Sequence, residues 1–135
     1  MTDKEIYDNQ ARLIKHYSNG LIYNLILWII SKEKIHGYGI MKKLEEFFDF
    51  KDADLEIKIT SSKIYPILRK MEENMLIVGE WDINENNKRV KYYSITDDGL
   101  LILDKLRCII SFISNNPAWL GFYSDMGVEI NEKCN

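Results

Sequence analysis

The chain has 135 residues, a length that fits one domain with a hydrophobic core or one small domain with helical extensions. Its 18 basic and 21 acidic residues give a net charge of −3, which argues against a protein that coats nucleic acid without specificity. The cysteines Cys108 and Cys134 and the histidines His16 and His36 show no ligand spacing, so we expect no metal site and no cofactor.

The N-terminus lacks the apolar run of a signal peptide. Residues 21–30 are strongly apolar but form too short a run to cross a bilayer. Together with the free thiols, these features favour a cytoplasmic protein that does not associate with a membrane.

Residues 1–20 are predicted to form an N-terminal helical extension. Thr2-Asp3-Lys4-Glu5 matches a capping box, in which the threonine oxygen and the glutamate satisfy each other's free backbone donors. Ser18-Asn19-Gly20 is typical of a helix end. Between these signals runs a narrow stripe that must pack on its own domain or on a partner subunit: Ile6, Gln10, Leu13, Ile14 and Tyr17.

Residues 21–31 are apolar almost all round, which predicts a central helix of the core. A second helix should begin at Gly37, and His36 is expected to cap this corner rather than act as an acid or base. Its predicted inward face comprises Ile40, Met41, Leu44, Phe47 and Phe48. The irregular, acidic residues 49–58 follow, although Leu55, Ile57 and Ile59 alternate and could form a short strand.

Residues 60–75 are predicted to form an amphipathic helix, which by itself is typical of an ordinary surface helix. Its core stripe is Ile64, Ile67, Leu68, Met71 and Met75. The cations Lys63, Arg69 and Lys70 precede both acids, Glu72 and Glu73. A helix that enters a DNA major groove with its N-terminal half needs this order, because phosphates attract cations.

The sequence allows more than one N-cap residue for this helix. If Ser62 is the cap, Pro66 removes only the first intrahelical bond. If Thr60 is the cap, the proline lies deeper and should kink the axis.

Residues 76–83 and 89–95 read as two strands joined by an asparagine-rich turn. Two helices followed by such a hairpin make a winged helix-turn-helix, which we place at residues 21–96. The hairpin carries Lys88, Arg89 and Lys91. A hairpin with a solvated basic tip and no DNA would have the same structure. The predicted fold class is therefore mainly α with a small β-hairpin wing.

Residues 97–116 should form a helix capped by Thr96. Its apolar surface is wider than one partner requires, so we expect a dimerisation helix and a homodimer. The predicted interface residues are Ile102, Leu103, Leu106, Ile109, Ile110 and Ile113.

Residues 117–135 form an aromatic tail that is expected to fold back on the domain or on the partner. An apolar pocket for a small aromatic effector is one interpretation of the chain's aromatic residues, and we favour plain packing. The residues concerned are Trp28, Trp119, Phe122 and Tyr123.

From residue 21 to residue 113 the chain resembles the PadR family of transcriptional regulators. The residues that carry the resemblance are Ile35-His36-Gly37-Tyr38, Ile64-Tyr65-Pro66-Ile67-Leu68 with Met71-Glu72, Leu76-Ile77, Trp81, Lys91-Tyr92-Tyr93-Ser94-Ile95-Thr96 and Gly99. The family usually has glycine where this chain has Asn74-Met75, so the helix exit should be capped differently, by Asn74.

The resemblance implies a dimeric, cytoplasmic repressor that binds palindromic operator DNA and can be released by a small molecule, with no enzymatic activity. It implies helix contacts, wing contacts and one contact near the DNA backbone, while Trp81 and Tyr93 are interpreted as wing packing. The expected DNA-binding residues are Ser61, Ser62, Lys63, Tyr65, Arg69 and Lys70 on the helix, Lys88, Arg89 and Lys91 on the wing, and Tyr38.

The alternative function is a winged-helix module for protein contact or ligand sensing with little affinity for DNA. An enzyme is disfavoured, because the chain shows no nucleophile with a base, no glycine-rich phosphate loop and no set of metal ligands.

Overall fold

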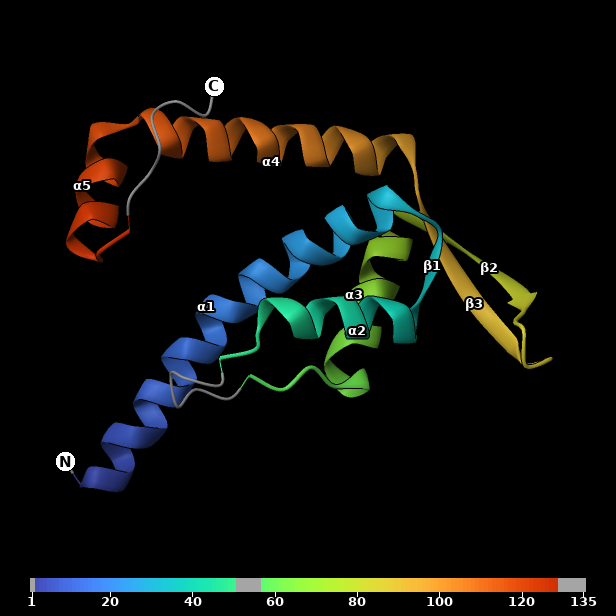
Figure 1. The fold of residues 1–135 in the computed structure, drawn as a ribbon, viewed down its shortest axis with the longest axis horizontal. Helices are drawn as coiled ribbons and strands as arrows, with labels where there is room; N and C mark the ends of the chain where they lie inside the picture. The colour runs from blue at the N-terminus through green and yellow to red at the C-terminus, as the bar shows by residue number, and fades with distance from the viewer. Residues whose placement is uncertain (1, 51–56, 129–135) are drawn as a thin grey trace. The chain divides into compact units, whose positions relative to one another are not determined.

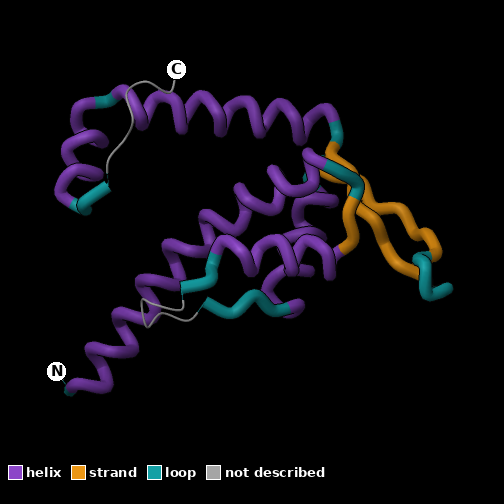
Figure 2. The backbone as a smooth tube through the Cα atoms, viewed as in Figure 1, coloured by secondary structure: helices purple, strands orange, loops and turns teal. Residues whose placement is uncertain are grey.

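The structure, a computed structural model, describes residues 2–50 and 57–128. The chain divides into two compact units, residues 1–100 and 101–135. The elements, shown in Figures 1 and 2, are α1 (Asp3–Lys32), β1 (Ile35–His36), α2 (Gly37–Phe47), α3 (Ser61–Glu73), β2 (Ile77–Ile83), β3 (Arg89–Ile95), α4 (Asp97–Asn115) and α5 (Pro117–Asp125). The predicted fold class, mainly helical with a small hairpin, is confirmed.

Helix α1 begins at the predicted capping box. The Glu5 amide donates to Thr2 Oγ1 at 3.2 Å, and the Thr2 amide donates to Glu5 Oε2 at 3.0 Å. The predicted end at Gly20 is wrong, because α1 continues without a break to Lys32. A glycine within a helix costs only about 1 kcal/mol, and burial of the aliphatic residues that follow outweighs that cost.

The predicted stripe on the first half of α1 is described only at Ile6, which is 40% exposed. Its other members, Gln10, Leu13, Ile14 and Tyr17, lie outside the side chains that the structure describes.

The second half of α1 supplies the centre of the core in the first unit. It packs against α2 and β3, and α2 packs against α3. The buried hydrophobic residues are Ile22, Ile26, Leu27, Ile29, Ile30, Ile35, Ile40, Leu44, Phe48, Ile64, Leu68, Met71, Ile77 and Tyr93. On α1 and α2, three predicted core positions are wrong: Trp28 and Phe47 meet edge to face on the surface, and Leu21 is also exposed.

A third strand, β1, was not expected from the sequence. It pairs antiparallel with β3, which also pairs antiparallel with β2, so the strand order is β1-β3-β2. His36 ends β1 and caps α2, as predicted, because its Nδ1 accepts from the Gly39 amide at 3.1 Å.

Helix α3 begins after Thr60, which is the N-cap, so Pro66 lies inside the helix. The structure therefore selects the second of the two predicted starts. The strand suggested by Leu55, Ile57 and Ile59 is absent from residues 57–60, and Leu55 lies outside the described residues.

The exit from α3 differs from expectation. Asn74 is the C-cap, but Met75 is the residue in the left-handed region, with φ of 61°. The Leu76 amide donates to the Met71 carbonyl at 2.9 Å and closes the turn. Because Met75 occupies this turn, its side chain is 69% exposed, and its predicted place in the core is wrong.

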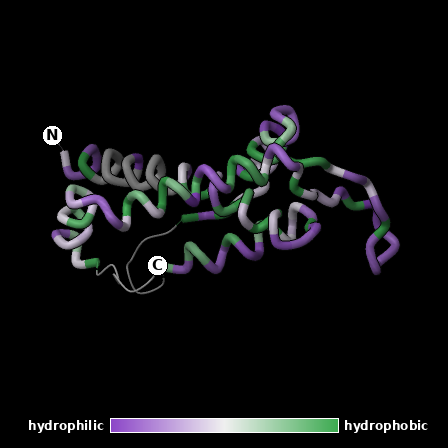
Figure 3. The backbone as a smooth tube through the Cα atoms, turned by 90° about the horizontal axis from the view of Figure 1, so that it is seen from above, coloured by the Kyte–Doolittle hydropathy of each residue, from purple (hydrophilic) through white to green (hydrophobic). Residues whose placement is uncertain are grey.

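The hairpin of β2 and β3, with its turn at residues 84–88, is called the wing below. Its two strands match the predicted ones within one residue. In the turn, Asn84 Oδ1 accepts from the amides of Asn86 and Lys88, and Asn87 has φ of 62°. The turn is strongly hydrophilic (Figure 3).

Helix α4 begins after Thr96, whose Oγ1 accepts from the Gly99 amide at 3.0 Å, as predicted. The start of the predicted aromatic tail is a helix, α5, because Asn116 Oδ1 accepts from the amides of Ala118 and Trp119 and Pro117 occupies its first turn. Residues 129–135 of that tail lie outside the described residues. Among the described helices, none is long and apolar enough to cross a membrane.

The turn after α3 leads to a stability prediction. Met75→Gly should raise the free energy of unfolding by about 0.5–1 kcal/mol, because glycine relieves the left-handed strain of an exposed side chain. Urea unfolding followed by circular dichroism measures the change. Asn87→Gly is the matched control and should gain less, because asparagine tolerates this conformation. A loss of stability in Met75→Gly would contradict this account of the turn.

Candidate nucleic-acid interface

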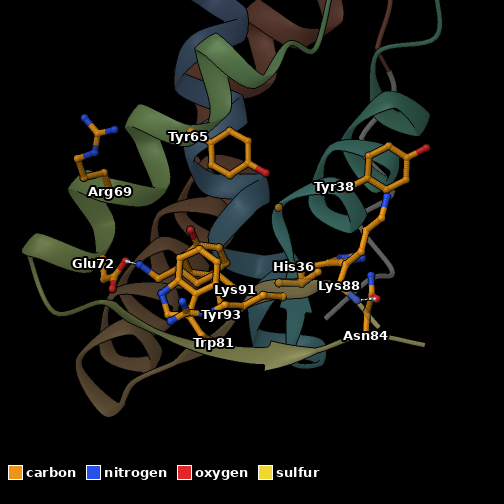
Figure 4. Close-up of a pocket in the computed structure, with 13 residues that line it drawn as sticks. His36, Tyr38, Tyr65, Arg69, Glu72, Trp81, Asn84, Lys88, Lys91 and Tyr93 are labelled. Atoms are coloured by element: carbon orange, nitrogen blue, oxygen red, sulfur yellow. Dashed lines mark hydrogen bonds and ion pairs between the residues drawn. The ribbon is translucent and has the colours of Figure 1, made fainter. Parts of the chain in front are cut away.

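A hollow of about 670 Å³ opens between α3, the start of α2 and the wing (Figure 4). Helix α3 contributes Tyr65, Arg69 and Glu72. The remaining lining residues are His36, Gly37 and Tyr38 from the β1–α2 corner, and Trp81, Asn84, Lys88, Arg89, Val90, Lys91 and Tyr93 from the wing. Aromatic rings and cations therefore surround one concave surface.

The helical wall of the hollow is the outward side of α3. Tyr65 and Arg69 are exposed and lie one turn apart, while Ile64 and Leu68 are fully buried beneath them. The period of 3.6 residues thus separates a core side from a surface side. Arg69 extends its guanidinium away from the core (Figure 4).

Tyr65 is held against the start of α2. A Cβ atom at Gly37 would lie 2.6 Å from Tyr65 Oη and 2.8 Å from its Cζ. Only glycine allows the ring to approach the α2 backbone so closely. The pair Gly37 and Tyr65 therefore joins α3 to the β1–α2 corner that precedes it.

The inner face of the wing carries alternate residues of both strands. Trp81, which was interpreted as wing packing, is 58% exposed. The wing projects beyond the helical core (Figure 1), so the indole keeps much of its surface exposed to solvent. The Arg89 guanidinium lies 4.8 Å from the centre of the Trp81 ring, within the range of a cation–π contact.

Tyr93 forms the base of the wing wall and is 5% exposed, which confirms the prediction that it packs. Burial raises the pKa of its phenol, and the ammonium of Lys91 opposes that shift. The Lys91 Nζ lies 5.6 Å from the centre of the Tyr93 ring. Tyr93 is therefore a neutral part of the wall.

Lys91 differs from the other wing cations because it is paired. Its Nζ lies 2.8 Å from Glu72 Oε1. The charge of Glu72 offsets that of Lys91, so the hollow presents the net positive charge of Arg69, Lys88 and Arg89.

The structure brings six of the ten predicted DNA-binding residues to the hollow: Tyr38, Tyr65, Arg69, Lys88, Arg89 and Lys91. The other four, Ser61, Ser62, Lys63 and Lys70, lie on α3 outside the hollow. At the start of α3, the hydroxyl oxygens of Thr60 and Ser62 lie 3.1 Å apart.

Sequence reasoning named neither Gly37 nor Val90 as a site residue, and it missed three polar side chains of the hollow: His36, Glu72 and Asn84. His36 stacks on Tyr92 with ring centres 5.4 Å apart, a contact that depends on the unexpected strand β1. Glu72 lies one turn after Arg69, and that spacing was the available signal that it shares the surface of α3.

The family model for the "Transcriptional regulator PadR-like family" matches residues 26–105. A PadR-like transcriptional regulator from Bacillus cereus is 32% identical, with a TM-score of 0.59, and the match covers 70% of this chain and 85% of that one. A protein from Streptococcus mutans is 28% identical, with a TM-score of 0.59 and coverage of 83% and 92%. No curated protein matches this chain significantly.

A PadR family transcription regulator from Clostridium difficile is 26% identical, with a TM-score of 0.56 and coverage of 68% of this chain and 88% of that one. The matched segment of the family model contains α2, α3, the wing and the start of α4. It therefore includes every residue that lines the hollow.

The close approach of Tyr65 to Gly37 can be tested without DNA. Gly37→Ala should lower the free energy of unfolding by about 1–2 kcal/mol, because the new methyl group overlaps the Tyr65 ring. In a Tyr65→Ala background the same change should be neutral or stabilising, because alanine favours a helix. Chemical denaturation of the four proteins gives the coupling. Equal effects in both backgrounds would show that Tyr65 does not lie against Gly37.

Proposed function

Because this chain belongs to the PadR-like family of transcriptional regulators, we propose that it is a cytoplasmic repressor that binds palindromic operator DNA as a homodimer. Members of this family regulate transcription through a winged-helix DNA-binding domain and are not enzymes. The observation that carries the proposal is the hollow, whose opposite walls both present cations to the same space.

We assign the helical side of the interface to the exposed half of α3. The residues proposed to contact DNA there are Ser61, Ser62, Lys63, Tyr65, Arg69 and Lys70. The hydroxyl and aromatic groups suit contacts to phosphates and base edges, while the cations attract the backbone. Glu73 follows at the end of α3, where the helix leaves the DNA in this arrangement.

We assign the second side of the interface to Lys88 and Arg89, with Tyr38 near the DNA backbone. Lys88 ends the turn of the wing, and both cations line the same hollow as Arg69. A duplex whose major groove receives α3 would bring its phosphates toward the wing. Trp81 offers an exposed ring beside Arg89 for contact with a sugar or base edge.

The proposed homodimer is supported by the apolar surface of α4. Ile109 and Ile110 are 54% and 67% exposed, and Leu101 and Phe112 are exposed as well. Ile102, Leu103, Leu106 and Ile113 are only half-buried within the chain. An exposed apolar surface on this scale is typical of a subunit interface. A two-fold dimer would in turn require an operator with two-fold symmetry.

The aromatic residues of α5 are the ones for which the sequence suggested either a pocket for a small effector or plain packing. Trp119, Phe122 and Tyr123 contact one another, with ring centres 5.5–6.2 Å apart. These mutual contacts favour packing over an effector pocket. Quenching of tryptophan fluorescence by a panel of aromatic compounds would decide between the two.

The DNA-binding proposal predicts a steep dependence on salt. Each protomer contributes a net charge of +3 from its hollow, so a dimer can neutralise six phosphates. The slope of log affinity against log salt should therefore be about −5 or steeper. Fluorescence anisotropy on fragments selected from genomic DNA measures it. The alternative, a protein-interaction or ligand-sensing module, predicts no selected sequence and only weak binding.

The double variant Lys63→Ala, Arg69→Ala should weaken operator binding by at least about tenfold and flatten the slope, because it removes four cations from the dimer. Anisotropy titrations at several salt concentrations provide both values. Lys32→Ala, an exposed cation on α1 outside the hollow, is the control and should bind as the unmodified protein does. Full affinity in the double variant would refute the assignment of the α3 surface.

The dimer proposal predicts that Ile110→Asp yields monomers, because a carboxylate would be buried in the apolar interface. The fold of each protomer should survive, since Ile110 is 67% exposed. Sedimentation equilibrium gives the mass, and Lys105→Asp on the exposed side of α4 is the control. A dimer of undiminished stability in Ile110→Asp would place the interface elsewhere.

A further inference from the structure

We propose that Lys91 is a positioning residue, which together with Glu72 and Gly79 locks the wing to the end of α3. The inference rests on the proposed DNA-binding function and changes the role that the sequence suggested for Lys91, a contact to phosphate. The three residues are called the wing lock below. They come from α3, β2 and β3, so the lock spans both walls of the hollow.

The ion pair of the wing lock is partly shielded from solvent. The side chains of Lys91 and Glu72 are 28% and 31% exposed. The ion pair of Arg107 and Asp104 on α4 is 79% and 65% exposed. Salt screens a shielded pair less, and such a pair holds its two side chains in one geometry more effectively.

The path of the Lys91 side chain depends on Gly79. In the hairpin register Gly79 is opposite Tyr93, and Trp81 is opposite Lys91. Lys91 therefore crosses diagonally over Gly79 to reach α3. A Cβ atom at Gly79 would overlap Lys91 Cε and would lie 3.3 Å from Glu72 Oε2. Glycine leaves the space through which the lysine passes.

The base of the wing is already held to the core, because Ile77 and Tyr93 are buried and β3 pairs with β1 and packs on α1. The wing lock adds a contact nearer the tip of the wing, beyond the turn of residues 74–76 that follows α3 and is called the hinge below. The Glu72 carbonyl accepts from the Met75 amide at 3.0 Å, so Glu72 belongs to the hinge through its backbone and to the wing lock through its side chain. The wing lock therefore restricts bending of the outer part of the hairpin relative to α3, in addition to the packing that holds the base of the wing.

The angle set by the wing lock determines the distance between the two basic walls. Arg69 lies one turn before Glu72 on α3, and Arg89 lies two residues before Lys91 on the same side of β3. The positions of Arg69 and Arg89 therefore follow those of Glu72 and Lys91. If the wing bends, Arg69 and Arg89 cannot both meet phosphates whose spacing the duplex sets.

Glu72→Gln, which removes the acidic partner of Lys91, distinguishes a phosphate contact by Lys91 from a positioning role. If Lys91 contacts phosphate, Glu72→Gln frees its ammonium and removes a repulsive charge, so operator affinity should rise. If Lys91 is a positioning residue, the same change loosens the wing, and affinity should fall about fivefold. The salt slope should stay within about one unit of that of the unmodified protein, because no proposed phosphate contact is lost. Tighter binding by Glu72→Gln would overturn the proposal.

Gly79→Ala tests the wing lock without changing any charge. The added methyl group should displace Lys91 from Glu72 and reduce operator affinity by about the same factor, fivefold, as Glu72→Gln. In a Lys91→Met background, Gly79→Ala should have little further effect. Gly20→Ala, where a Cβ atom meets nothing within 4 Å, is the matched control. Unchanged affinity in Gly79→Ala, measured on a protein with an unchanged circular dichroism spectrum, would overturn the proposal.

Residual dipolar couplings of the backbone amides report the orientation of the wing relative to α3 in the free protein. We expect a single orientation in the unmodified chain and reduced wing couplings in Glu72→Gln and in Gly79→Ala. Equal couplings in all three proteins would overturn the wing lock even if DNA binds. If no operator is selected but the couplings fall as expected, the wing lock stands and the proposed DNA-binding function fails.

Discussion

Burial of the second half of α1 is the constraint on which the rest of the first unit depends. Ile22, Ile26, Ile29 and Ile30 are almost completely buried. Full burial of one such side chain contributes about 1.5–3 kcal/mol, whereas an exposed ion pair contributes at most about 1 kcal/mol. Because α2 and β3 pack directly on α1, this apolar side decides where α3 and the wing can lie.

Polar contacts then define the joints between these packed elements. His36 ends β1 and caps α2, and Thr96 ends the hairpin and caps α4. The Thr96 hydroxyl also donates to the Met75 carbonyl at 2.6 Å, which connects the exit of α3 with the start of α4. Each joint satisfies backbone groups that would otherwise be exposed at a helix end. The elements around the hollow are thereby held by packing and by specific hydrogen bonds together.

Short sequence motifs predicted the local structure correctly where the motif is compatible with only one conformation. The capping box at Thr2, the cap at His36 and the turn at residues 84–87 all form as predicted. The same reasoning failed at Gly20, because a glycine permits a helix end without requiring one. It also failed at Trp28 and Phe47, since an apolar side chain does not reveal whether a neighbour is present to bury it.

The sequence by itself determined the helices and the hairpin of the winged-helix domain, the polarity of α3 and the basic character of the wing, because periodicity and charge order are properties of a local stretch. Tertiary structure alone decided that β1 joins the sheet, that Trp81 remains exposed and that Lys91 pairs with Glu72 across Gly79. Those outcomes depend on which residues distant in the chain become neighbours. Packing of α1, α2 and β3 makes that choice, and no single stretch encodes it.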